Sequence, residues 1–384
     1  MQKMLFLLLL IPALAPGQTT IEFRLHSNEL KSDRTIRINT PAYYDLGKDS
    51  LQLIFLLDGD NTSLFDYTVA AKRFTEGNAA DLSDYKTPEA IIIGIGQSAD
   101  RWDDFGDSVN SRKFLSFLEK ELMPFVESHY RTVPYKVLIG HSLAGRFAIN
   151  TLLTRPELFN AIIAASPAIP DKLINKILSG FDNLFKSKLP FDKALYFSTT
   201  YMKGDGTEEG FRPFAEALVK YLKTKNVANF RYEFNSSATL GHAKSPFFSI
   251  PEGIHFIYSP SLWQLETDSL FSSGSTALSA VNRYLLRIKK RFGITVPAHP
   301  FAAILADEWE RSGNPKEAIE LLKTEAGKQP ADIDLFVRLL ALLKKNNLPE
   351  YKAYQEKLAT IFQLLQIPEK EQKEWKEWID NNSH

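Results

Sequence analysis

A serine stands at the junction between an apolar run and a helix-like stretch in YKVLIGHSLAGRFAINTLL, residues 135–153. Small residues flank it, with Gly140 two positions before it and Ala144 and Gly145 shortly after it. A serine on a sharp strand-to-helix turn is a nucleophile elbow, usually written G-x-S-x-G, and its neighbours must be small for the strand and helix to approach. Ser142 is therefore the candidate nucleophile, with Ala144 in place of the second glycine of the pattern.

A serine hydroxyl needs a base within hydrogen-bond reach, and a third group must orient that base. In the α/β-hydrolase order, the acid and then the histidine follow the serine. Of the downstream histidines, His255 lies in an apolar, helix-like segment, and His299 and His384 lie in or at the end of the helical tail. His242 instead lies in the loop SSATLGHAKS, directly after the strand-like segment FRYEFN. His242 is therefore the candidate base.

The acid is expected after the strand-like segment ALYFSTT, which is followed by MKGDGTEEGF. This segment offers Asp205, Glu208 and Glu209. Such residues are also common in turns that cap a following helix, so the cluster could be structural. We predict Asp205 as the acid, with Glu208 as the alternative.

The oxyanion of an acyl-transfer intermediate needs two backbone N–H donors. Leu143, directly after the candidate nucleophile, is expected to supply one of them. The loop LLDGD places Gly59 and Asp60 after a buried strand-like segment, where the second donor is expected. The same loop does not fit a calcium site, because Ser63 stands where a glycine is needed and no glutamate closes the twelve-residue loop.

A second glycine-containing segment, GIGQSA at residues 94–99, fits the pattern G-x-G-x-x-A of a dinucleotide site. Such a site requires a helix to open at once, whereas the stretch that follows here, DRWDDFGDS, is predicted to be a polar loop. We therefore expect this segment to form one wall of a substrate cleft. The candidate substrate contacts are Asp58, Arg101 and Trp102.

The elements around these residues alternate between strand and helix patterns. Continuous apolar runs predict strands buried on both faces of a mainly parallel sheet, and helix-period segments lie between them. Alternating apolar residues near the beginning of the chain predict antiparallel strands that make the sheet mixed. Together they predict an α/β fold with a mostly parallel central sheet. The strand-like segments are at 19–41, 51–60, 89–96, 136–140 and 160–166, with two more near Leu195 and Tyr232.

The composition and the beginning of the sequence limit the classes of partner and the cellular location to be expected. Lys and Arg together number 46, as do Asp and Glu, so the charge balance does not favour nucleic acid or an anionic membrane. The chain has no cysteine, which excludes disulfides and thiolate chemistry. Lys3, about ten apolar residues and a group of small residues form the pattern of a signal peptide over 1–17, too short to span a bilayer. The mature protein is expected to be secreted or periplasmic.

The end of the chain has a different pattern. A polar, serine-rich stretch at 268–279 is followed by helix-period segments. Two similar helix–turn–helix units of about 30 residues follow, and the first resembles a tetratricopeptide repeat. We expect a small all-α domain that packs on the main domain or docks a protein partner. A helical appendage without a binding role is the alternative.

Several segments resemble the "putative esterase" family, which includes esterase D-like proteins, enterochelin-type siderophore esterases and mycolyltransferase-like proteins. They are IFLLDGD, IIIGIG…DR, FLEKELMPFVESHYRT, LIGHSLAGRFAI and LGHAKSP, in that order within about 19–258. The resemblance implies an α/β-hydrolase fold and a Ser-acid-His mechanism. It places the nucleophile on Ser142, the base on His242 and the oxyanion donors on Leu143 and Asp60. The sequence departs from the family pattern at Ala144 and at Lys203, which lies near where an acidic residue often occurs.

The resulting expectation is a secreted serine esterase that requires no metal or organic cofactor. Its substrate would be a siderophore ester, a glycan-linked ester or a small acyl ester. The alternatives are a peptidase or acyltransferase on the same scaffold, or a non-catalytic binding protein that acts through the helical tail. The predicted division is a signal peptide at 1–17, an α/β-hydrolase esterase domain at 18–265, a linker and connecting helix at 266–295, and a tetratricopeptide-like helical domain at 296–384.

Overall fold

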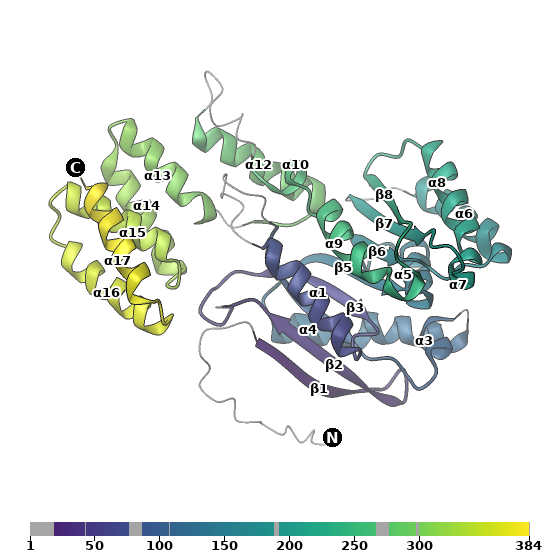
Figure 1. The fold of residues 1–384 in the computed structure, drawn as a ribbon. Helices are drawn as coiled ribbons and strands as arrows, with labels where there is room; N and C mark the ends of the chain where they lie inside the picture. Colours follow the sequence, from purple (N-terminus) through teal and green to yellow (C-terminus); the bar gives the residue numbers. More distant parts are fainter. Residues whose placement is uncertain are drawn as a thin grey trace. The chain divides into compact units, whose positions relative to one another are not determined.

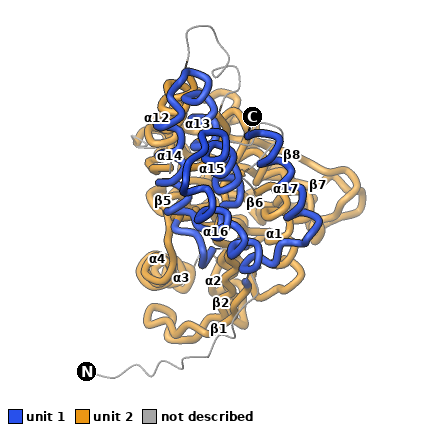
Figure 2. Tube along the Cα trace, turned by 90° about the vertical axis from the view of Figure 1, so that its left-hand side faces the viewer, with its two compact units in different colours: residues 1–19, 41–48, 302–384 blue, residues 20–40, 49–301 orange. Residues whose placement is uncertain are grey.

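The computed structural model describes most of the chain, in two compact units (Figure 2). The larger unit contains Thr20–Thr40 and Asp49–Phe301, and the smaller unit contains Pro41–Lys48 and the chain from Ala302 onward. The signal peptide predicted at 1–17 and His384 lie outside the described residues. The described residues are 19–42, 44–76, 87–106, 108–187, 192–265, 276–296 and 299–383.

An eight-stranded sheet runs through the larger unit in the order β1-β2-β4-β3-β5-β6-β7-β8 (Figure 1). β2 pairs antiparallel with β4, and every neighbouring pair from β4 to β8 is parallel. The prediction of a mixed, mostly parallel sheet is therefore confirmed. The strands are β1 (Thr19–Ser27), β2 (Ser32–Thr40), β3 (Leu51–Leu57), β4 (Ala90–Ile95), β5 (Thr132–His141), β6 (Ala161–Ala165), β7 (Lys193–Thr200) and β8 (Phe230–Ser237).

Helices cover the sheet and bury its apolar runs. Every residue of β3, β4, β6 and β7 is buried, as expected for strands covered on both faces. α9 packs on β6 and β7 beside α1, and α5 packs on β5 and β6 beside α6. The helices and helical turns of this unit are α1 (Thr62–Thr75), α2 (Arg101–Phe105), α3 (Val109–Phe117), η1 (Leu118–Leu122), α4 (Met123–His129), α5 (Leu143–Thr154), α6 (Asp171–Lys186), α7 (Gly206–Glu209), α8 (Arg212–Lys223), η2 (His242–Lys244), α9 (Pro246–Ile257), α10 (Pro260–Trp263), α12 (Ala277–Phe292) and η3 (His299–Phe301).

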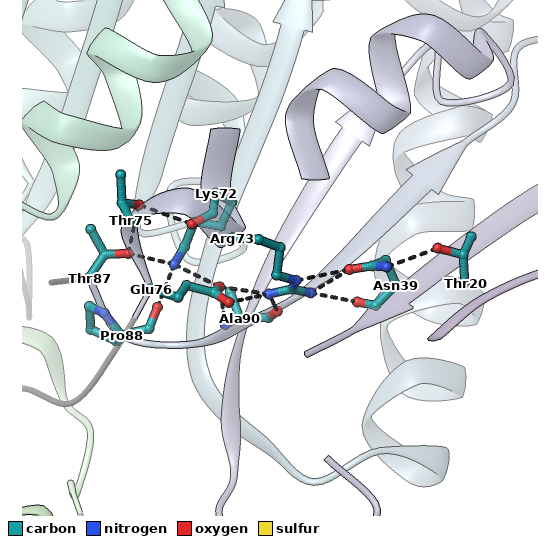
Figure 3. A network of polar contacts seen from close by, with 9 residues as sticks. All are labelled: Thr20, Asn39, Lys72, Arg73, Thr75, Glu76, Thr87, Pro88 and Ala90. Carbon is teal, nitrogen blue, oxygen red and sulfur yellow. Dashed lines mark hydrogen bonds and ion pairs between the residues drawn. The ribbon is translucent and has the colours of Figure 1, made fainter. Parts of the chain in front are cut away.

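A buried polar network fixes the end of α1 (Figure 3). The Lys72 side chain is fully buried, and its Nζ donates to Glu76 Oε1 at 2.9 Å and to Thr87 Oγ1 at 2.8 Å. Arg73 pairs with the same Glu76 and also donates to Asn39 at the end of β2. The network lies near the amino end of β4, so it holds α1 against the sheet at the edge opposite the carboxyl ends of the parallel strands.

The smaller unit is helical and has a hydrophobic core of its own. α13 packs on α14, α14 on α15, and α15 on both α16 and α17. The tetratricopeptide-like character and the domain boundaries at 265 and 296 remain predictions. The segment 266–295 contains α12, whose Phe292 stacks on Trp263 with ring centroids 4.4 Å apart. The helices are α13 (Ala302–Arg311), α14 (Pro315–Lys328), α15 (Ile333–Lys345), α16 (Tyr351–Leu364) and α17 (Glu369–Asn381).

Candidate active site

Ser142 lies on the turn between β5, which ends at His141, and α5, which begins at Leu143. Its backbone has φ 60° and ψ −118°, a conformation that residues with a side chain rarely adopt. Three hydrogen bonds hold the strained peptide in place. The Ser142 N–H donates to Ala165 O at 2.9 Å, and the Ser142 carbonyl accepts from Arg146 N–H at 3.0 Å and Ala168 N–H at 2.9 Å. The surrounding structure therefore fixes the backbone that carries the hydroxyl.

The residues around Ser142 are small because the strand and the helix approach each other closely at this turn, as the sequence predicts. A Cβ on Gly140 would lie only 2.4 Å from the carbonyl oxygen of Ala144, so no other residue fits there without a shift of backbone. Ala144 itself is fully buried. The alanine that departs from the usual pattern is therefore accommodated in the packed turn.

Three side chains form a hydrogen-bonded chain at the carboxyl edge of the sheet. Ser142 Oγ lies 2.9 Å from His242 Nε2, and His242 Nδ1 lies 2.6 Å from Glu208 Oε2. Because an ionised carboxylate only accepts hydrogen bonds, Nδ1 carries the proton. Nε2 is then free to accept the proton of Ser142, which is the arrangement of a nucleophile, a base and an orienting acid.

Glu208 is fully buried and its second oxygen is also bonded. Oε1 accepts from Thr199 Oγ1 and, at 2.8 Å, from the Thr200 N–H. Burial raises the pKa of Glu208, but the hydrogen bonds from His242, Thr199 and Thr200 outweigh it and hold the pKa below its ordinary value. Glu208 is therefore ionised at neutral pH and can stabilise a positive imidazole.

The structure does not place Asp205, the acid preferred from the sequence, against the imidazole. Asp205 is the N-cap of α7, and its carboxylate turns toward backbone N–H groups, as capping residues do. Its Oδ2 accepts from the His242 N–H at 2.5 Å, and its Oδ1 accepts from the Glu208 N–H at 3.2 Å. Glu209 is exposed, and its Oε1 lies 4.0 Å from Arg212 Nη1. The alternative, Glu208, is the carboxylate that contacts the imidazole.

The two predicted oxyanion donors remain available. Leu143 is the first residue of α5, so its N–H has no acceptor within the helix, and the helix N-terminus favours negative charge. Asp60 is exposed in the turn after β3, and its carboxylate accepts from the Gln97 N–H. Within the described part of the chain, neither the Leu143 N–H nor the Asp60 N–H is used in a hydrogen bond.

Two of the candidate substrate contacts are bonded to each other. Arg101 donates to both carboxylate oxygens of Asp58, at 2.9 and 2.6 Å, and to the carbonyl of His141 at 3.3 Å. Burial raises the pKa of Asp58 in spite of Arg101. The pair thus links the loop after β3 to the turn of Ser142. Trp102 is 61% exposed, and the Arg146 guanidinium lies 5.2 Å from its ring. A substrate contact at any of these residues remains a prediction.

His141 is a site residue that the sequence reasoning did not single out. Its Nε2 lies 3.0 Å from the carbonyl oxygen of His242, and the two ring centroids are 4.8 Å apart. Burial, and then the neighbouring His242, lower the pKa of His141 to about 4. His141 is therefore neutral at neutral pH and donates its Nε2–H to that carbonyl. Its place directly before Ser142 was the available signal.

The residues that form this site lie within a region that matches a known protein family. The sequence profile described as "Putative esterase" matches residues 27–286, more than half of the chain. The chain belongs to this family. The family match covers strands β2–β8 and every residue of the candidate site.

Comparisons with individual proteins agree with the family. The chain is 40% identical over 184 residues to the "Siderophore triacetylfusarinine C esterase" of Aspergillus fumigatus, covering 41% of this chain and 59% of that protein. It is 36% identical over 69 residues to "Ferri-bacillibactin esterase BesA" of Bacillus subtilis, covering 18% of this chain and 23% of that protein. The chain thus spans less than two thirds of either relative. In fold it is similar to an "IroE-like serine hydrolase" from Shewanella oneidensis, with 21% identity, a TM-score of 0.60, and coverage of 80% of this chain and 99% of that chain.

Proposed function

We propose that this protein hydrolyses carboxylic esters through an acyl-enzyme on Ser142. The observation that supports this most directly is the unbroken hydrogen-bonded chain from Ser142 Oγ through the His242 imidazole to Glu208. Membership of the esterase family supports ester hydrolysis independently of that geometry. In this proposal Glu208, and not Asp205, is the acid.

The reaction follows from the positions of the protons. His242 Nε2 takes the proton of Ser142 as Oγ bonds to the ester carbonyl carbon, and the carbonyl electron pair moves onto oxygen. The N–H groups of Leu143 and Asp60 would hold this oxyanion. When the intermediate collapses, the C–O bond to the alcohol breaks and the imidazolium protonates the departing oxygen. Water then attacks the acyl-enzyme, with His242 again as the base.

The proposal also includes a substrate class and a location. The Aspergillus fumigatus relative is named as a siderophore esterase, so a siderophore ester is the first substrate to test. Glycan-linked and small acyl esters come next. The signal-peptide pattern at 1–17 supports a secreted or periplasmic protein. No helix in the described ranges is long and apolar enough to cross a membrane.

The test combines an active-site probe with an ester panel. Wild type should be labelled by a fluorophosphonate and should hydrolyse at least one ester from a panel of siderophore, feruloyl, acetyl and short acyl esters. Ser142→Ala should lose both properties. Ser128→Ala, at an exposed serine on α4, should keep both. A folded wild type that is neither labelled nor active on the panel, or an active Ser142→Ala variant, would refute the proposal. Cleavage of peptides in preference to esters would favour a peptidase.

A further inference from the structure

Asp205 makes an unusual pair of contacts for a helix-capping residue. Its two carboxylate oxygens accept one backbone N–H each, from Glu208 at 3.2 Å and from His242 at 2.5 Å. These are the residues proposed as the acid and the base. Glu208 lies in α7, after β7, and His242 begins η2, after β8. One carboxylate therefore joins the backbones of two separate loops at the points where the proposed acid and base are attached.

We propose that Asp205 is a positioning residue that sets the distance between the Glu208 carboxylate and the His242 imidazole. The inference rests on the proposed function, since it assigns Asp205 a role through those two residues. A carboxylate is rigid, and hydrogen bonds to an ionised acceptor are about twice as strong as neutral ones. A displacement of either backbone would change the 2.6 Å contact between His242 Nδ1 and Glu208 Oε2.

On its amino side, the segment that carries His242 is held by Ser237 at the end of β8, whose Oγ accepts from the Thr239 and Leu240 N–H groups at 3.3 and 3.2 Å. β8 is the edge strand of the sheet, and η2 is a turn of only three residues. The N–H groups at the beginning of a helical turn have no acceptor within it, so the His242 N–H needs an outside partner. On the other side, the His242 carbonyl accepts from His141 Nε2 at 3.0 Å and from the Ser245 N–H at 3.1 Å. Asp205 completes this fixation from the amino side.

Gly241, directly before the base, makes the contact possible. A Cβ on Gly241 would lie 2.9 Å from Asp205 Oδ2 and 3.3 Å from Met202 Sδ. The Gly241 backbone has φ −83°, which any residue can adopt, so the close approach and not the backbone requires glycine here. Alanine at this position would push the carboxylate away without removing any hydrogen-bonding group.

The charge of Asp205 suits this role. The hydrogen bond from the His242 N–H, opposed by burial and helped by the Glu208 N–H, lowers the pKa of Asp205 below its ordinary value. The carboxylate is therefore ionised at neutral pH, and both of its oxygens accept. An amide at position 205 would have one acceptor oxygen, while its NH₂ group would face one of the two N–H groups as a second donor.

Two variants test the proposal from different sides. Asp205→Asn keeps a good capping residue but loses one of the two acceptors, since asparagine and aspartate cap helices about equally well. Gly241→Ala displaces the carboxylate. Asp332→Asn, at the N-cap of α15 in the smaller unit, is the matched control, because Asp332 accepts from the Leu335 N–H in the same way. Each protein is assayed for kcat and KM on an ester that wild type cleaves, and for thermal stability.

The expected result is a loss of kcat without a loss of substrate binding. Asp205→Asn should lower kcat by about 10- to 100-fold, because a misplacement of about 1 Å can cost about 100-fold. Gly241→Ala should lower kcat by a smaller factor, and the double variant should be no worse than Asp205→Asn, since both changes break one contact. KM should stay within about twofold of wild type, and Asp332→Asn should match wild type in both constants.

The outcomes separate this inference from the proposed function. A wild type that cleaves no ester contradicts the proposed function, and this inference falls with it. If wild type is active and Ser142→Ala is not, full kcat in a folded Asp205→Asn overturns the inference alone. An unchanged kcat in Gly241→Ala also overturns the inference. If Asp205→Asn does not fold, the kcat of Gly241→Ala decides whether the inference holds. A rise in KM at unchanged kcat would assign these residues to substrate binding and would also overturn it.

Discussion

The His242 imidazole and its peptide groups are held from four directions. Glu208 binds Nδ1, Ser142 meets Nε2, Asp205 accepts from the backbone N–H, and the His141 ring donates to the backbone carbonyl. A base fixed in this way does not need to reorient when the proton moves, and such preorganisation is a main source of catalytic rate. The side chains that fix the backbone matter because His242 lies in a short turn and not within a long helix or strand.

Glu208→Gln tests which carboxylate acts as the acid. A glutamine can present its NH₂ group to Nδ1, which favours the tautomer with a proton on Nε2 and prevents Nε2 from accepting from Ser142. We expect kcat to fall by about 1,000- to 10,000-fold, as for an amide at the acid position of other triads. Steady-state kinetics on the same ester measure it. If Asp205→Asn reduced kcat more than Glu208→Gln, the acid would be Asp205 after all.

His141 should make stability depend on pH. Its pKa is about 4 in the folded chain and 6.5 ordinarily, so between these values the unfolded chain binds more protons. The free energy of unfolding should therefore decrease as the pH falls from 6.5 to 4, by up to about 3 kcal/mol from this group. His141→Gln keeps an N–H donor but does not titrate, so its stability should fall less over this range. Urea unfolding at several pH values measures both. Parallel curves for the two proteins would contradict the expectation.

The local sequence around each residue explains how much of the site could be predicted. Ser142 and His242 could be selected because an elbow pattern and a histidine in the right order are both local signals. Asp205 and Glu208 follow the same strand three positions apart, so no local signal separates them. The four-residue helix α7 decides, because it turns Asp205 toward N–H groups and Glu208 toward the ring. The pairing of Arg101 with Asp58 joins residues 43 positions apart and has no local pattern.

At the scale of elements, the apolar runs were informative because strands buried on both faces consist mostly of apolar residues. Four such runs became β3, β4, the end of β5 and β6. The spatial order of the strands could not be read in the same way, since β4 lies between β2 and β3. The polar stretch after 94–99 contains the five-residue helix α2, capped by Asp100, where the sequence predicted a loop. Its length is too short for a helical period to appear in the sequence.

The buried polar network at the end of α1 leads to a prediction about the stability of the fold. Lys72→Met keeps the length of the side chain but removes the amine that joins Glu76 to Thr87 (Figure 3). Removing one partner of a buried ion pair usually costs about 3–5 kcal/mol, and the remaining pair between Glu76 and Arg73 should reduce this to about 2–3 kcal/mol. Chemical denaturation measures the change, with Lys113→Met on the exposed side of α3 as the control.

The kinetic constants of Lys72→Met test whether the network affects stability alone. The network lies near the amino end of β4, whereas Ser142 follows the carboxyl end of β5. The folded variant should therefore keep the kcat and KM of wild type. A variant as stable as wild type, or one that is stable but has lost kcat, would contradict this assignment of the network to stability alone.

At the scale of the whole molecule, the candidate site and the helical tail belong to different compact units. The proposed nucleophile, base and acid and both oxyanion donors lie within Asp49–Phe301. The smaller unit has its own core, built from α13–α17, against which Leu46 also packs. Because no residue of the proposed chemistry comes from the tail, hydrolysis of a small ester should not require it. A role of the tail in docking a protein partner would affect only activities that need that partner.

A chain that ends at Phe301 tests this separation. Because Leu46 would lose its apolar partners, the truncated chain should carry Leu46→Ser to avoid an exposed apolar side chain. We expect its kcat on a small ester to stay within about threefold of the full chain, which corresponds to less than about 1 kcal/mol in the activation free energy. Circular dichroism and fluorophosphonate labelling of Ser142 establish that the shortened chain is folded. A folded, labelled chain whose kcat has dropped more than about tenfold would show that the helical unit takes part in catalysis, and the division of roles argued here would be wrong.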